Sequence, residues 1–114
     1  MKILAITQKG TNKVENEDRI VIGKSIIAEG YFQTNISSGV VAIADGVGGN
    51  SAGAVASHFV AQELTNRNAI SQDCLIQINN DLLQLSCTCE DYSNMATTLS
   101  CIWLDSNKRY IYIV

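Results

Sequence analysis

The stretch VAIADGVGGN, residues 41–50, joins a run of small and β-branched apolar residues to one acidic residue and three glycines. The apolar run extends from Gly39 to Ala44 and predicts a strand that is buried on both faces. Asp45 follows directly, so its carboxylate is expected at the end of a buried strand. An acid in this position is either a cation ligand or part of an ordinary Asp-Gly turn.

The hydrophobic period changes to that of a helix after the glycines. From Ser51 to Leu64, apolar residues recur at three- and four-residue steps, with Asn50 or Ser51 available to cap the first amides. A second helix is predicted over residues 71–86. Its apolar stripe consists of Leu75, Ile78, Leu82 and Leu85.

Four other segments have the β-branched and aromatic composition of strands: Lys2–Thr7, Asp18–Ile27 (broken at Gly23), Thr97–Leu104 and Arg109–Val114. Residues 28–38 are polar and are expected to form a hairpin connection, and residues 105–108 a turn. The order of three strands, two helices and two strands indicates an α+β fold, with antiparallel β-sheet flanked by helices on a face.

Composition limits the class of protein. With 114 residues, of which 46% are hydrophobic, residues 1–114 are expected to belong to a single domain. The net charge is -3 and no basic run is long, which argues against nucleic acid as a partner. No segment approaches the roughly 20 apolar residues of a membrane span, and the first residues lack a signal-peptide core.

The four cysteines are predicted to be reduced thiols, which implies a cytoplasmic location. Their spacing is not that of a zinc site, and small core residues are the favoured interpretation over metal ligands. They are Cys74, Cys87, Cys89 and Cys101.

A second acidic place precedes the strand that starts at Asp18. Glu15, Glu17 and Asp18 repel one another unless a cation or hydrogen-bond donors relieve them. If the strands are neighbours, Glu17 or Asp18 meets Asp45 at one sheet edge, as a hard divalent cation requires. The alternative is a solvated acidic face. The glycine-rich stretch matches neither the dinucleotide fingerprint nor a Walker loop.

Three blocks together resemble a known family. They are KVENED (residues 13–18), VAIADGVGG (residues 41–49) and MATTL (residues 95–99). In order and rough spacing they are similar to the first three signature blocks of the metal-dependent protein phosphatases, the PPM or type 2C serine/threonine family. The resemblance covers the amino-terminal half of the family's domain, which implies an incomplete α-β-β-α sandwich.

The resemblance implies a role for each matching residue. Asp45 would bridge two Mg²⁺ or Mn²⁺ ions, and the Gly46 carbonyl would bind one of them. Glu17 and Asp18 would bind the ions directly or through other ligands, and all three acidic residues would belong to the catalytic site. Lys13 would contact the substrate phosphate. The family's reaction is in-line attack by a metal-activated water on a phosphoserine or phosphothreonine of a protein substrate, without a covalent enzyme intermediate.

Three departures from the family pattern change the expectation. Lys13 stands where the family usually has an arginine, and it lacks the bidentate fork of that residue. Ala96 replaces a glycine of the third block. The GDSR block and the later aspartates of the family do not follow. The chain alone is therefore expected to be inactive or nearly so, unless a separate chain supplies the other half. The alternative is a non-catalytic module that binds a partner through an exposed sheet edge.

Overall fold

The structure is a computed structural model that describes residues 1–107 and 109–113. Lys108 of the predicted turn and Val114 of the last predicted strand lie outside the described residues. The elements are β1 (Lys2–Thr7), β2 (Asp18–Ile22), β3 (Ser25–Ile27), β4 (Gly30–Asn35), β5 (Gly39–Val47), α1 (Ala52–Thr65), α2 (Gln72–Ser86), a short 3₁₀ turn η1 (Glu90–Tyr92), β6 (Ala96–Thr97), β7 (Ser100–Leu104) and β8 (Arg109–Ile113).

The strands form two antiparallel sheets. The larger sheet has the order β3-β2-β5-β7-β8, and β6 pairs with the last residues of β5. The smaller sheet consists of β1 and β4, which pair from Lys2 opposite Asn35 to Thr7 opposite Gly30. The predicted α+β class with antiparallel sheets and flanking helices is confirmed.

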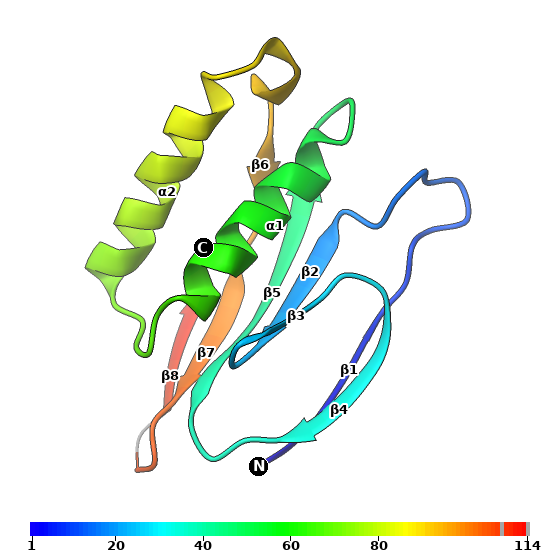
Figure 1. The fold of residues 1–114 in the computed structure, drawn as a ribbon. Coiled ribbons are helices and arrows are strands. Elements are labelled where there is room, and N and C mark those ends of the chain that lie inside the picture. The colour runs from blue at the N-terminus through cyan, green and yellow to red at the C-terminus, as the bar shows by residue number, and fades with distance from the viewer. Residues whose placement is uncertain (108, 114) are drawn as a thin grey trace.

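The larger sheet is covered differently on its two faces (Figure 1). Along β5, Val40, Ala42 and Ala44 are buried in one cluster with the residues of α1. Ile20 and Ile22 of β2 are buried in a second cluster with residues of β1 and β3. Because successive side chains of a strand alternate between faces, the helices cover one face and the β1–β4 ribbon covers part of the other.

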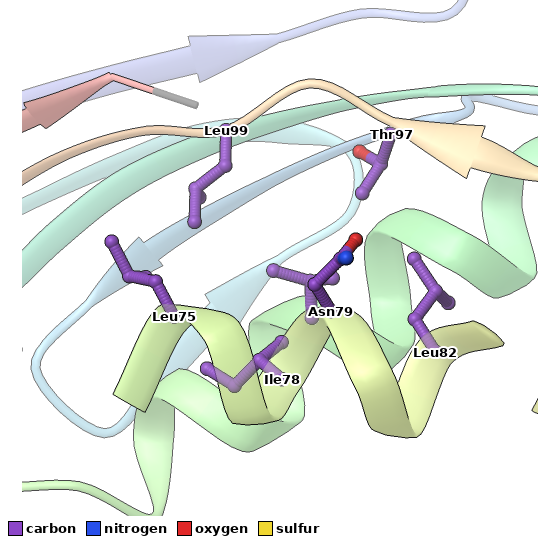
Figure 2. A pocket seen from close by; sticks show the side chains of 7 residues that line it. Leu75, Ile78, Asn79, Leu82, Thr97 and Leu99 are labelled. Atoms are coloured by element: carbon purple, nitrogen blue, oxygen red, sulfur yellow. The ribbon is translucent and has the colours of Figure 1, made fainter. Parts of the chain in front are cut away.

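Both predicted helices are present, but they are buried to different depths. Small residues along α1 let it lie close to the sheet: Ala52, Ala56 and Ala61 are at most 1% exposed. On α2 only Ile78 and Leu82 are buried. Figure 2 shows Leu75, Ile78 and Leu82 of the predicted stripe around a small, mostly apolar cavity of about 40 Å³, with Leu99 on the other side.

The segment of residues 28–38 corrects one expectation. It is not a simple hairpin connection, because it contains β4, whose Phe32 packs in the cluster under β2. The predicted strand at residues 18–27 is a hairpin of β2 and β3, and Gly23 takes a positive φ of 61° in its turn. Sequence composition identified the polar residues of this region but not the alternation along β4.

The start of α1 corrects another expectation. Ser51 occupies the N-cap position with a φ of 66°, and its side chain makes no capping hydrogen bond. The Asn50 side chain donates from Nδ2 to Asp91 Oδ1 at 3.4 Å. The left-handed conformation at both residues turns the chain sharply, and the Ala52 amide donates to the Gly49 carbonyl at 3.0 Å. No helix within the described residues has the length and apolar character to cross a bilayer.

Candidate metal centre

The carboxyl end of β5 and the start of β2 bring two predicted site residues together. Asp18 is the register partner of Asp45 in the antiparallel ladder. Directly opposed residues of such a pair project to the same face and lie close together. This is the face opposite α1, because Ala44 beside Asp45 is buried toward the helix.

The Asp18–Asp45 pair is electrostatically unfavourable without a cation. Burial raises the pKa of the Asp18 carboxyl, and the charge of Asp45, a hydrogen bond with Asp45 and the charge of Glu17 raise it further, against a lowering by Arg19. Within residues 1–107, no lysine or arginine forms an ion pair with either aspartate. Two opposed carboxylate groups of this kind match the oxygen ligands that Mg²⁺ and Mn²⁺ prefer.

A cavity of about 160 Å³ lies over the pair. Its lining includes Lys13, Glu17, Asp18, Asp45 and Gly46, the five site residues predicted from the sequence. The Lys13 side chain is 63% exposed, and its Nζ lies 3.8 Å from Glu17 Oε1. Lys13 is therefore at the mouth of the cavity, paired with Glu17.

Glu17 is placed differently from Asp18. Its Oε2 lies where a Cβ on Gly53 would stand, which places this carboxylate against α1. In the described part of the chain, no group of three or more Asp, Glu, His or Cys side chains converges as a metal site. The structure thus joins Asp18 to Asp45 but not Glu17 to both. The roles of Glu17 and of the Gly46 carbonyl as ligands remain predictions.

Asn16 holds the acidic segment in place, a role that was not predicted from the sequence. Its Nδ2 donates to Thr7 Oγ1 at 2.8 Å and to the Ala28 carbonyl at 3.0 Å, and its Oδ1 accepts from the Asp18 amide at 3.0 Å. It therefore ties the start of β2 to β1 and to the segment before β4. The only indication of this role in the sequence was the position of Asn16 between two acidic residues of the first block.

Thr98 fixes the backbone of Asp45 from the other side. Its amide donates to the Asp45 carbonyl at 2.9 Å, and its Oγ1 accepts from the Asp45 amide at 3.3 Å. The third sequence block therefore supports the second, although it supplies no acidic ligand. A pair of threonines just before β7 was the only indication of this in the sequence.

A separate cavity of about 320 Å³ lies on the helix side of β2. It is lined in part by Glu15, Arg19 and His58. Glu15 Oε1 and Arg19 Nε are buried there without a hydrogen-bond partner, and burial, together with the charge of Arg19, lowers the pKa of His58. Arg19 Nη1 donates to the carbonyls of Asn16 and Asp18, each at 2.7 Å. Arg19 therefore stabilises the backbone of the acidic segment from the face opposite the aspartate pair.

The cysteines do not all occupy the core, contrary to the favoured interpretation. Cys101 is buried and Cys74 half-buried, but Cys87 and Cys89 are exposed. The last two follow the end of α2, where the chain has left the helix layer. Cys74, Cys87 and Cys89 form no disulfide.

The solved structures that resemble this chain share one fold. No protein-family model and no curated protein matches the sequence. Three of the similar solved structures are the serine/threonine phosphatase PstP/Ppp from Mycobacterium tuberculosis (21% identity, TM-score 0.74), a variant of a bacterial serine phosphatase (25%, 0.69) and the serine/threonine phosphatase Stp1 from Staphylococcus aureus (20%, 0.62).

These matches cover 100%, 97% and 96% of this chain, but 46%, 51% and 51% of the respective phosphatase chains. The chain thus spans about half the length of the proteins that it resembles. At this level of identity the likeness establishes the architecture. The chain has the fold of the PPM-type serine/threonine phosphatases, and it corresponds to about half the length of those phosphatase chains.

Proposed function

We propose that this chain carries part of the active site of a metal-dependent protein serine/threonine phosphatase. The observation that supports the proposal most directly is the register of Asp18 opposite Asp45 at one end of the β2–β5 ladder. The phosphatase fold of the solved structures agrees with it. A phosphoserine or phosphothreonine protein is the proposed substrate, and the proposed reaction is hydrolysis of the phosphomonoester.

Each residue of the site has a proposed part. Asp45 and Asp18 hold Mg²⁺ or Mn²⁺, with the Gly46 carbonyl and Glu17 as further ligands on the cavity wall. Two bound ions would lower the pKa of an attacking water and neutralise the phosphoryl oxygens. Lys13, at the mouth of the cavity, attracts the substrate phosphate as a point charge without the bidentate geometry of arginine.

The number of ligands limits what these residues do alone. Three carboxylates and one carbonyl, shared between two divalent ions, hold them more weakly than the larger oxygen sets of tight sites. We therefore propose that residues 1–114 form the amino-terminal part of a single domain of this type, and that full activity needs acidic ligands from elsewhere in the polypeptide or from a separate chain. A cytoplasmic location, compatible with the exposed thiols of Cys87 and Cys89, belongs to the same proposal.

Isothermal titration with Mn²⁺ tests the proposal. The chain should bind Mn²⁺ with a Kd of about 10⁻⁴ to 10⁻³ M, the range of weak oxygen-ligand sites. Asp45→Asn should remove this binding. Asp73→Asn, which alters an exposed carboxylate in the first turn of α2, should leave it unchanged and is the matched control.

A phosphopeptide assay with Mn²⁺ complements the titration. The chain alone should give turnover close to background, because it brings too few ligands together. Rapid turnover that disappears in Asp45→Asn would support the phosphatase but contradict the need for further ligands. Absence of any Mn²⁺ binding would contradict the metal site and favour the second candidate, a non-catalytic module built on the same fold. Lys13 in place of an arginine is the feature that favours this second candidate.

A further inference from the structure

Two buried polar side chains within the described residues, Thr7 and Ser57, both bind the segment that leads into β2. Thr7 Oγ1 accepts from the side-chain amide of Asn16 at 2.8 Å. Ser57, 0% exposed on α1, donates from Oγ to the Glu17 carbonyl at 2.6 Å, a shorter contact than the 3.3 Å to the Ala54 carbonyl of its own helix. Because an unpaired buried hydroxyl costs free energy, each of these side chains is stabilised by its bond to this one segment.

The bond from Ser57 acts on the peptide unit that joins Glu17 to Asp18. The Glu17 carbonyl oxygen also accepts from the Gly46 amide at 3.1 Å, and the Asp18 amide donates to Asn16 Oδ1 at 3.0 Å. Both polar ends of this planar unit are therefore fixed. Since the Cα of Asp18 belongs to the same plane, its orientation determines where the Asp18 carboxylate stands relative to Asp45.

Close contact between α1 and β5 brings Ser57 within reach of that carbonyl. A Cβ on Gly46 would overlap the Gly53 carbonyl, and a Cβ on Gly53 would lie 2.8 Å from the carbonyl carbon of Gly46. The two glycines thus let the helix backbone touch the strand. Ser57 follows Gly53 by four residues, so it lies on the same side of the helix, one turn further on.

We propose that Ser57 is a positioning residue for the metal centre: its hydroxyl holds the Glu17–Asp18 peptide unit so that the Asp18 carboxylate faces Asp45. Its effect on cation binding rests on the function proposed above, whereas its effect on the peptide unit does not. A serine that served only as a small residue at a close contact would be replaceable by alanine without consequence at the site. The two interpretations therefore predict different behaviour for Ser57→Ala.

The test compares Ser57→Ala with Ser86→Ala. Ser86 on α2 also donates to a backbone carbonyl at 2.6 Å, that of Leu83, but it belongs to the other helix. Substituting a residue that supports the metal ligands without binding the metal typically lowers metal affinity 10- to 100-fold. Ser57→Ala should raise the Kd for Mn²⁺ about tenfold in isothermal titration, and Ser86→Ala should leave it unchanged.

Hydrogen exchange measured by NMR without metal supplies an independent readout. In Ser57→Ala the amide of Gly46, which donates to the same Glu17 carbonyl, should exchange about tenfold faster, by local opening. The amide of Ala42, in the middle of β5, should be unaffected. Unchanged exchange at Gly46, or equal acceleration at Ala42, would overturn the proposal. If the unmodified chain binds no Mn²⁺, the proposed function fails, and the exchange data alone decide the role of Ser57.

Discussion

At the scale of single residues, the site is a pair of like charges held together by the backbone. Asp18 and Asp45 are opposed because the β2–β5 register places them so, and their repulsion is imposed by the fold. The raised pKa of Asp18 is the physical consequence, and its largest cause is burial. Such a pair destabilises the metal-free chain, and a bound cation would offset the repulsion between the two carboxylates.

The effect of this repulsion on stability depends on pH. Because the pKa of Asp18 is higher in the folded chain than its ordinary value of 3.8, the folded chain retains a proton that the unfolded chain releases. The resulting stabilisation is complete below pH 3.8 and is lost as the pH rises through the raised folded value. In EDTA, Asp18→Asn should therefore be more stable than the unmodified chain at pH 7.

Urea denaturation at several pH values checks this expectation. The difference between Asp18→Asn and the unmodified chain should shrink as the pH falls, since protonated Asp18 and asparagine are both neutral. An Asp18→Asn chain that is less stable at pH 7 than the unmodified chain would contradict the like-charge description of the site.

At the scale of elements, the contact between α1 and the end of β5 determines the geometry of the site. Gly46 and Gly53 permit this contact, and Ser57 and Thr98 fasten the two acid-bearing strands on either side of it. The glycines of the opening stretch therefore differ in function. Gly46 is needed for close approach, whereas Gly49 has open space around it.

Alanine substitutions separate these two kinds of glycine. Gly53→Ala should lower the free energy of unfolding by about 1–3 kcal/mol, because the new methyl group overlaps the Gly46 backbone and Glu17 Oε2. Gly49→Ala, the matched control, meets no atom within 4 Å and should change it by less than about 0.5 kcal/mol. Equal stabilities of the two variants in urea denaturation would contradict the close-contact interpretation.

The sequence predicted the elements with strong periodicity and missed those determined by tertiary contacts. Both helices and a strand that starts at Gly39 followed from hydrophobic spacing. The prediction that this strand ends before Asp45 and is buried on both faces was wrong, because β5 continues to Val47 and Ile43 is exposed. β4 was missed because its alternation is visible only once Phe32 is known to pack under β2. The capping role of Ser51 was wrong because capping propensity does not predict a left-handed N-cap.

The candidate site shows the same division. Asp18 and Asp45 were predicted to meet, since an acid at a strand start and one at a strand end can be neighbours in an antiparallel pair. Glu17, given as the alternative to Asp18 in this meeting, precedes β2 and lines the same cavity, and its role as a ligand stays a prediction. Ser57 and Arg19 were not identified, because their roles depend on hydrogen bonds to backbone carbonyls more than on any sequence pattern.

At the scale of the whole molecule, the fold accounts for one wall of a metal centre. The aspartate pair lies on the face of the sheet away from the helices. The β1–β4 ribbon covers that face beside β2 and β3 (Figure 1). Ile43 and Ile102 remain 54% and 39% exposed on the same face. The site is therefore on a face of the sheet that is only partly covered.

Paramagnetic broadening by Mn²⁺ in an amide NMR spectrum of the chain tests the central claim most directly, because it reports where the ion lies. At substoichiometric Mn²⁺, the signals of Asp18, Asp45 and Gly46 should broaden first, and those of Asp73 and its neighbours at the start of α2 should stay sharp. In Asp45→Asn this selective broadening should be lost. Broadening centred elsewhere, or unchanged in Asp45→Asn, would contradict the assignment of a divalent-cation site to the Asp18–Asp45 pair.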